Sequence, residues 1–275
     1  MRPTWGISEP TFLAGYVVLG LVVWAATTRA RHALAGGPDR PGPGPGQPHD
    51  LAILNDGADL AITCALTSMH LKGTVALSRG KAVAIGRPGA GTDGLERAVH
   101  AATGRRVRRH RLATTAPVRR ELDAMERRLV ADGLLLSGAR RAAVRAVGWW
   151  TLVFAALGLA WLLWGAAWSG FVHPMIEIVI FAILLALYQL RSAPRRSRPG
   201  DRLLARLRSE HHALRPGSRP DWVVHGPAAA AVGIAVFGAS ALWASDPALA
   251  EELALQRASG GGDGASMEGG DGGSV

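Results

Sequence analysis

Residues 149–168 read WWTLVFAALGLAWLLWGAAW and residues 172–190 read VHPMIEIVIFAILLALYQL, with only Ser169-Gly170-Phe171 between them. Each run is close to the ~20 apolar residues that a helix needs to cross a bilayer core of about 30 Å. A connector this short leaves the second helix no place except beside the first, so the two must be antiparallel neighbours. The stretch therefore predicts a transmembrane helical hairpin, and arginines flank both of its outer ends.

The overall composition fits a membrane protein that carries a soluble part. The 275 residues include nine tryptophans and are 48% hydrophobic, with a mean hydropathy of +0.15 and a formal net charge of +10. The basic residues are arginines except for Lys72 and Lys81, which with the abundance of Ala and Gly indicates a high-GC genome. The single cysteine, Cys64, excludes an internal disulfide and a multi-cysteine metal site, and its apolar surroundings favour a buried, inert thiol.

An earlier apolar run, residues 12–28, predicts another span. Only Arg2 precedes it, whereas Arg29 and Arg31 follow at once, which is the reverse of the charge order in a signal peptide. Because positive residues are retained in the cytoplasm, we expect this helix to insert with residues 1–11 outside and to remain uncleaved.

The same charge rule orients the rest of the chain. Residues 29–148 contain twenty Arg or Lys against ten acids, and residues 191–226 contain nine Arg against three acids. Both segments are therefore expected in the cytoplasm, with the hairpin connector outside, in a multi-pass plasma-membrane protein.

A fourth run, residues 227–244, is rich in Ala and Gly and only moderately apolar. Small residues recur four apart along it, so another helix can approach closely, and we expect it to insert by packing against the hairpin. Residues 245–275 then form a short helix, capped by Ser245, and a disordered Gly-rich tail. The tail lies outside if the fourth run spans the membrane and in the cytoplasm if it does not.

A Pro/Gly-rich linker at residues 29–48 leads from the first span to a module at residues 49–135. Helical spacing covers 49–71 with a break at 55–57, where Asp56 is expected to cap the second helix. The succession of a further hairpin and further helices gives the module the order of a small winged-helix-like domain.

Within this module, alternation over residues 74–85 predicts a β-hairpin, and Asp93 is expected to cap a helix that ends at Ala102. A basic loop and a longer helix at 116–131 follow, and residues 136–148 form a basic approach to the membrane. Gly73 and Gly133 are each expected to end a helix in the left-handed conformation. Four residues are expected on the inner face of the β-hairpin: Val75, Leu77, Val83 and Ile85. The fold class is thus mainly α, a multi-pass helical membrane protein with a small α/β cytoplasmic module.

The chain also resembles a family of multi-pass membrane proteins of high-GC bacteria that has no assigned activity. The resemblance covers the N-terminal span, the linker into Asp50-Leu51-Ala52-Ile53-Leu54, the sequence Leu71-Lys72-Gly73, the Arg-rich approach to the hairpin and the Gly-rich tail. It extends to seven residues near the C-terminus: Val236, Phe237, Gly238, Ala239, Leu242, Asp246 and Pro247. Tails in that family are often rich in Gly and Cys, but the tail here has no Cys, so no metal or redox role follows for it.

Two arginine clusters are candidate contacts for anionic lipid headgroups, to which each basic residue near the membrane surface contributes about 1 kcal/mol. The candidates are Arg105, Arg106, Arg108, Arg109, Arg111, Arg195, Arg196 and Arg198. A solvated loop and a simple topology determinant remain alternatives. Nucleic acid is disfavoured as a partner because residues 58–71, the position of a recognition helix, offer no Arg, Lys, Asn or Gln to base edges.

Glu177 is the only acid within an expected span, and His173 lies one helical turn before it. An ionisable pair inside a membrane is a functional candidate. The alternative is that Glu177 reaches the outer interface and has no function beyond solvation.

The sequence contains no His-Glu-x-x-His, phosphate loop, Gly-x-Ser-x-Gly or Cys-x-x-Cys, and we expect no cofactor and no metal. Two hypotheses remain. The first is a membrane-anchored interaction or scaffold protein whose cytoplasmic module binds a protein partner. The second is a membrane enzyme or small-molecule sensor that uses Glu177 and His173 near the outer face.

Overall fold

The computed structural model describes residues 9–34, 36, 45–78, 81–89, 91–104, 107–165, 173–191 and 194–253. These residues are mainly helical with one small three-stranded sheet, which confirms the mainly α expectation. The chain forms two compact units. Unit 1 comprises Met1–Asp50 and Asp123–Leu207, and unit 2 comprises Leu51–Leu122 and Arg208–Val275.

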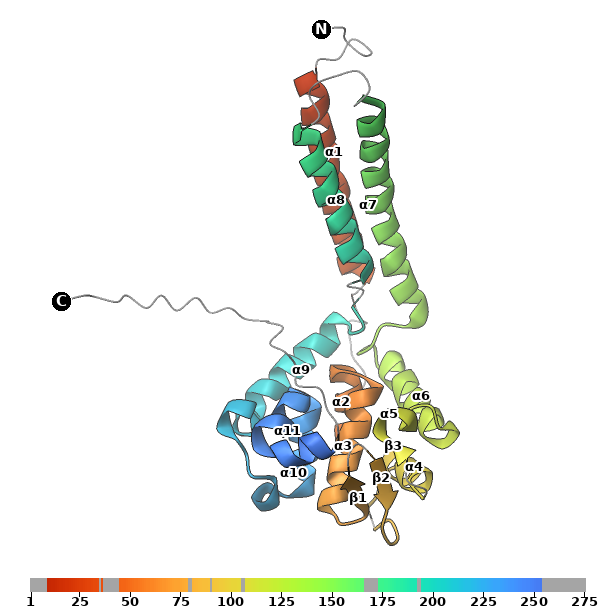
Figure 1. The fold of residues 1–275 in the computed structure, drawn as a ribbon, viewed down its shortest axis with the longest axis vertical. Helices are drawn as coiled ribbons and strands as arrows, with labels where there is room; N and C mark the ends of the chain where they lie inside the picture. Colours follow the sequence, from red (N-terminus) through yellow and green to blue (C-terminus); the bar gives the residue numbers. More distant parts are fainter. Residues whose placement is uncertain are drawn as a thin grey trace, which may run out of the picture. The chain divides into compact units, whose positions relative to one another are not determined.

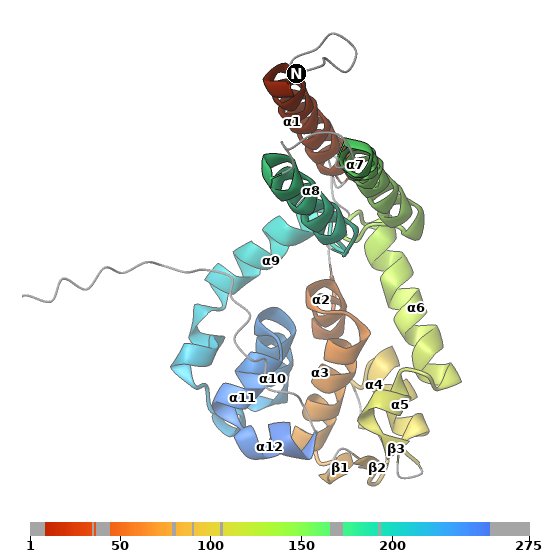
Figure 2. The same cartoon turned by 45° about the horizontal axis from the view of Figure 1, so that its top comes forward.

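Three long helices dominate unit 1: α1 (Glu9–Leu34), α7 (Gly138–Gly165) and α8 (His173–Arg191). α7 runs antiparallel to α8 and packs along both α8 and α1 (Figures 1 and 2). The expected antiparallel pair is therefore confirmed, while its connector at 169–171 lies outside the described residues. Among the described residues, one helix is long and apolar enough to cross a membrane, Gly138–Ala160 of α7, with a mean hydropathy of 1.6.

The start of α7 differs from the expectation. The helix begins at Gly138, so the basic approach at 136–148 is largely the first turns of the same helix. Ser137 precedes it and accepts a hydrogen bond on Oγ from the backbone N–H of Arg140 at 3.3 Å. Arg141 lies in the first turn and donates to Glu126 of α6 (Ala116–Ala131) at 2.7 Å, which holds a charged turn against the preceding helix.

A short antiparallel clasp joins the two chain segments that enter and leave the α7–α8 pair. Leu135 pairs with Arg196, and the backbone N–H of Leu136 donates to the carbonyl of Arg195 at 3.0 Å. The buried Ser197 also donates hydrogen bonds to the other segment, from its N–H to the carbonyl of Leu134 at 3.0 Å and from its hydroxyl to the carbonyl of Gly133 at 2.6 Å. The clasp fixes the spacing of the two segments where α9 (Arg198–Glu210) begins.

Unit 2 is built around α3 (Ala58–Leu71), whose ten residues from Leu60 to Met69 are all buried. A helix that is enclosed on every side has no polar face, which explains the near absence of charge in its sequence. Its neighbours come from distant parts of the chain. α10 (Trp222–Phe237) packs along α3, and α4 (Gly94–Ala102) and β1 (Val75–Ser78) also contact α3. α3 and α10 lie side by side in Figures 1 and 2.

The remaining elements are short. They are α2 (Pro48–Asn55), β2 (Lys81–Ala84), β3 (Val107–Arg108), α5 (Arg109–Leu112), η2 (His212–Leu214), η3 (Pro216–Ser218), α11 (Ala239–Ser245) and α12 (Pro247–Glu252). The sheet order is β1-β2-β3, with both pairs antiparallel. The segment expected as a basic loop thus contains β3 and α5, two elements too short to leave a periodic pattern in the sequence.

Several local predictions are confirmed. Asp93 caps α4 by accepting a hydrogen bond from the N–H of Glu96 at 2.7 Å, and α6 has the expected bounds. Gly73 and Gly133 have φ of 69° and 72°, as expected of the left-handed residue that ends a helix. The cap of α3 was predicted wrongly, because Gly57 occupies that position with φ 89° and no side-chain hydrogen bond.

The β-hairpin is present, but its expected inner face is wrong on β2. Ser78 pairs with Lys81, so Leu77 lies opposite Ala82 and Val75 opposite Ala84. Directly paired residues share a face, and a shift by one residue moves a side chain to the other face. Accordingly Val75, Leu77 and Ala82 are buried, whereas Val83 is half-buried and Ile85 is 51% exposed.

The fourth apolar run does not form the single helix expected over 227–244. α10 ends at Phe237, Gly238 has φ 81°, and α11 starts at Ala239. The small residues of the run permit a close helix contact, and the helix that α10 packs along is α3, within unit 2. The cap of the following helix is also one residue later than expected, because Asp246 and not Ser245 accepts from Leu249 N–H at 2.9 Å.

The expected module at 49–135 therefore differs from the unit that the structure shows. The core of unit 2 combines Leu51–Leu122 with the segment after Arg208, and α10 supplies the buried Ala231, Ile234 and Ala235. The winged-helix-like order describes only the first of these segments. The Gly-rich tail beyond Leu253 lies outside the described residues.

Candidate functional site

A groove of about 700 Å³ runs along the three-helix bundle of unit 1. α1 and α8 form its walls and α7 its floor, to which Thr151 and Phe154 contribute. On α1 the lining extends from Tyr16 to Trp24, and on α8 it extends from Glu177 to Leu185. The lining is almost entirely apolar, so the groove can enclose a hydrocarbon chain.

Among the described residues that line this groove, Glu177 is the only charged one. Its side chain is exposed and it forms no hydrogen bond or ion pair with the described residues. The backbone places His173 one turn before Glu177 at the start of α8, as expected, but the side chain of His173 lies outside the described part of the structure. The structure thus brings Glu177 to a cavity and leaves the expected pair untested.

One wall of the groove depends on a close contact between α1 and α7. The rings of Tyr16 and Phe154 stack with centroids 4.5 Å apart, and the Tyr16 hydroxyl donates to the Phe154 carbonyl at 3.2 Å. Tyr16 lies over Gly158, where a Cβ atom would come within 2.7 Å of its Cζ and 3.1 Å of Val179 Cγ2. The absence of a side chain at Gly158 therefore lets α1 approach the α7–α8 pair.

The first arginine cluster is divided by the fold. Arg105 and Arg106 lie outside the described residues, while Arg108 and Arg111 are exposed on β3 and α5. Arg109 is partly buried, since its guanidinium lies 4.0 Å from Asp59 and donates to the Thr63 hydroxyl at 3.4 Å. Arg109 therefore fastens α5 to α3 and is less available to a lipid headgroup than its neighbours.

The second cluster belongs to the clasp of unit 1. Arg195 and Arg198 have exposed side chains, whereas Arg196 is half-buried and forms an ion pair with Asp201 at 3.0 Å. The clasp holds the backbone of Arg195 and Arg196, so the positions of these two residues are set by hydrogen bonds that do not involve their guanidinium groups. Arg195 and Arg198 remain candidates for contact with anionic headgroups.

A second polar feature of unit 1 was not expected from the sequence. A cleft of about 390 Å³ lies between α6 and the start of α7, lined by Asp123, Glu126, Arg127, Ser137 and Arg141 among others. The lining contains both acids and arginines, and the Arg141–Glu126 ion pair joins α7 to α6 there. Its mixed charge favours an internal structural role over recognition of a ligand of one sign.

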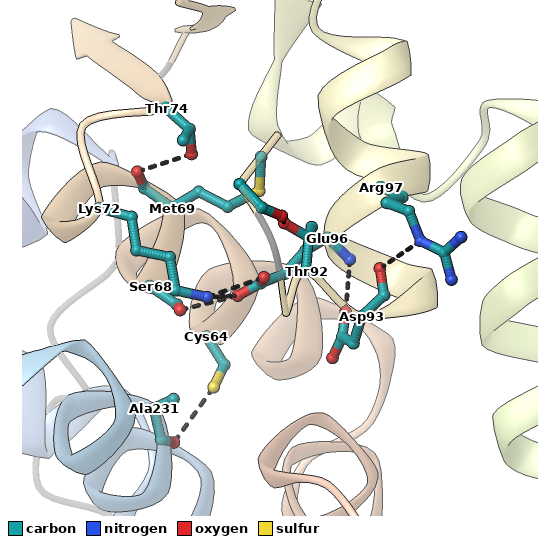
Figure 3. Close-up of polar contacts among 11 residues, drawn as sticks. Cys64, Ser68, Met69, Lys72, Thr74, Thr92, Asp93, Glu96, Arg97 and Ala231 are labelled. Atoms are coloured by element: carbon teal, nitrogen blue, oxygen red, sulfur yellow. Dashed lines mark hydrogen bonds and ion pairs between the residues drawn. The ribbon is translucent and has the colours of Figure 1, made fainter. Parts of the chain in front are cut away.

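Unit 2 contains an ion pair between the end of α3 and α4 in which only the acid is buried (Figure 3). The Nζ atom of Lys72 lies 2.9 Å from each carboxylate oxygen of Glu96, and the hydroxyl of Ser68 donates to the same carboxylate at 2.7 Å. The Glu96 side chain is 3% exposed and that of Lys72 is 37% exposed. The carboxylate is fully engaged, so the cluster connects two helices and presents no free base to a substrate.

Cys64 is buried on α3, as expected, and its thiol donates to the carbonyl of Ala231 on α10 at 3.1 Å (Figure 3). The thiol therefore contributes to packing between α3 and α10. Among the described residues, no group of three or more His, Cys, Asp and Glu side chains could hold a metal ion.

Sequence reasoning missed the groove as a whole. Glu177 could be found as an isolated acid in an apolar run, but Tyr16 lies 138 residues before Phe154, and no local pattern links Tyr16 to Phe154 or Gly158. It also missed the Lys72–Glu96 pair, although Lys72 directly precedes the helix-ending Gly73 and Glu96 lies three residues after the cap Asp93.

Comparison of the chain with protein-family models, with curated proteins and with solved structures finds no match.

Proposed function

We propose that the chain is an integral membrane protein in which unit 1 is the anchor and unit 2 is an interaction domain that binds a protein partner at the cytoplasmic face. The resemblance to multi-pass membrane proteins of high-GC bacteria belongs to the same proposal.

One observation carries this proposal. The two segments of unit 2 flank α7 and α8 in the sequence, yet they share a core in which Asn55 Nδ2 donates to the carbonyls of Ala235 at 3.0 Å and Val236 at 3.1 Å. Segments that share a core must lie on the same side of a membrane. If α7 crosses the bilayer, the chain has to cross back before Arg208, and α8 is the apolar helix in that interval.

α1 supports a third crossing. It packs along α7 through Tyr16 and exposes a continuous apolar surface, in which Val18, Leu21 and Val22 are each about 60% exposed. Such a surface is costly in water and favourable in lipid. The excess of arginine in residues 29–148 and 191–226 then places unit 2 in the cytoplasm.

The outer face of the β-hairpin is the surface of unit 2 that we assign to the partner. Ile85 is 51% exposed directly after β2, beside the half-buried Val83. Adjacent apolar side chains that remain exposed give this face a small apolar patch that a protein partner can cover. The enclosed helix α3 presents no such surface, which argues against recognition of a nucleic acid by this helix.

Photo-crosslinking of the full chain in cells tests this assignment. A benzophenone amino acid at Ile85 should yield one discrete crosslinked band, while the same group at Asp56, which is exposed on the α2–α3 turn, should yield none. Membrane fractions washed with alkaline carbonate should retain the protein. Release by carbonate would contradict the anchor, and identical smears at both positions would contradict the interaction surface.

A second candidate function is a membrane enzyme or sensor that uses Glu177 and His173. The observation that favours it is the position of Glu177 on the groove of unit 1. If a Glu177→Gln variant still binds the small molecule that the wild type binds, the enzyme or sensor function is contradicted.

A further inference from the structure

The groove of unit 1 has the volume of a ligand site. Its ~700 Å³ lies within the range of about 300–1,000 Å³ that is typical of pockets for small molecules. The lining on α8 runs from Glu177 to Leu185, a rise of roughly 12 Å along the helix. This length and the apolar walls match one extended hydrocarbon chain.

The charge in the groove indicates the chemistry of the polar end of the ligand. Glu177 is the first α8 residue of the lining, so its carboxylate stands at one end of the apolar channel. Among the side chains that the structure describes, no Lys, Arg or His lines the groove, and the side chain of His173 is not among those described. A carboxylate at membrane depth is costly without a cationic partner, and a bound cation would supply the missing charge.

We propose that the groove binds a single-chain amphiphile with a cationic amine, whose hydrocarbon lies between α1 and α8 and whose ammonium group pairs with Glu177. This inference rests on the proposed membrane anchor, because the groove faces lipid only if unit 1 lies in the bilayer. It does not require a particular protein partner for unit 2.

Two other occupants are less consistent with the lining. An ordinary lipid chain would fill the apolar walls but would leave the carboxylate unpaired. A helix from a second copy of the chain would bring the apolar faces of α1, α7 or α8, and the described parts of those faces carry no cation at this depth.

The test uses the full chain purified in a neutral detergent, with dodecylamine as the cationic probe and dodecanol as its uncharged counterpart. Binding of each is measured by displacement of a fluorescent alkyl probe. The wild type should prefer dodecylamine by about tenfold, the factor that corresponds to ~1.4 kcal/mol. Glu177→Gln should bring the two dissociation constants together without weakening dodecanol.

A pair of tryptophan variants locates the site. Leu185→Trp places bulk in the groove and should weaken both probes, whereas Leu184→Trp changes a residue that is 60% exposed and does not line the groove, and should leave both unchanged. Equal effects of the two variants would show that the probes bind elsewhere.

The outcomes separate this inference from the proposed function. A protein that stays in the membrane after a carbonate wash, but binds dodecanol as tightly as dodecylamine, contradicts the ligand and leaves the anchor intact. A preference for dodecylamine that survives in Glu177→Gln likewise contradicts the role of this carboxylate. Release from the membrane by carbonate would instead contradict the anchor and the inference together.

Discussion

Gly158 shows at the scale of single residues how the bundle of unit 1 depends on a missing side chain. Tyr16 occupies the space that a Cβ atom would need, and its hydroxyl is already engaged by the carbonyl of Phe154. The same device recurs in unit 2, where a Cβ atom on Gly233 would lie 2.7 Å from Cη2 of Trp222. In each case the glycine is needed for close packing and not for an unusual backbone angle.

We predict that Gly158→Leu separates α1 from the α7–α8 pair. Overpacking typically costs about 1–3 kcal/mol, and here the displaced group is an aromatic ring that also stacks on Phe154. Thermal unfolding of the detergent-solubilised protein should begin at a lower temperature. Gly15→Leu is the matched control, because nothing lies within 4 Å of a Cβ atom at Gly15. Equal losses in the two variants would contradict the contact.

The Lys72–Glu96 pair allows a second prediction at this scale. Lys72→Met leaves a buried carboxylate with the Ser68 hydroxyl as its remaining side-chain partner, and should destabilise unit 2 by about 1–3 kcal/mol, less than a fully buried pair because Lys72 is partly exposed. The double variant Lys72→Met/Glu96→Gln should recover part of this loss, since no charge is then buried. Chemical denaturation measures both, and a double variant less stable than the single one would rule out this account.

At the scale of elements, the end of α10 is fixed by side chains from both segments of unit 2. Asn55 donates to two carbonyls of its last turn, and Arg208 donates through Nε to the carbonyl of Val236 at 3.3 Å. Arg208 also reaches Asn55 Oδ1 at 3.2 Å. These contacts satisfy carbonyl groups that a helix terminus leaves without an intrahelical partner.

Asn55→Ala should therefore weaken the contact between the end of α2 and α10, and with it the packing of α10 along α3. Loss of two hydrogen bonds, at ~0.5–1.5 kcal/mol each, predicts a destabilisation of roughly 1–3 kcal/mol. Hydrogen exchange should increase in α10 and in α3 together, because they form one packed pair. Ser240→Ala, which removes a local exposed hydrogen bond to Phe237, should leave exchange unchanged in both. Faster exchange confined to α2 would be inconsistent with a shared core.

Elements were predictable from the sequence where the signal is local. The caps at Asp93, Gly73 and Gly133, the helix at 116–131 and the antiparallel α7–α8 pair all depend on residues within a few turns of one another. The buried face of β2 was not predictable, because the alternation of side chains defines two faces and only the pairing of Ser78 with Lys81 decides which face is buried. The groove and the α3–α10 joint depend on residues more than a hundred positions apart.

At the scale of the whole molecule, the fourth apolar run, residues 227–244, shows most clearly what the sequence alone could not predict. A moderately apolar, Ala-rich segment can be buried by lipid or by protein, and burial in either environment favours the same amino-acid composition. What decides between them is the existence of α3, a helix with no polar face that needs a partner on every side. The hydropathy of residues 227–244 contains no information about that partner.

Unit 2 is assembled from segments on both flanks of the α7–α8 pair, so under the proposed membrane anchor both segments lie on one side of the membrane. Single cysteines at Ser78 and at Glu252, both exposed, report on the two flanks separately. A Cys64→Ser background removes the native thiol and keeps a donor for the Ala231 carbonyl. With an impermeant thiol reagent, the account predicts that neither cysteine is labelled in intact cells and that both are labelled after lysis. Labelling of Glu252→Cys in intact cells, with Ser78→Cys still protected, would place the two flanks on opposite sides and contradict the shared core.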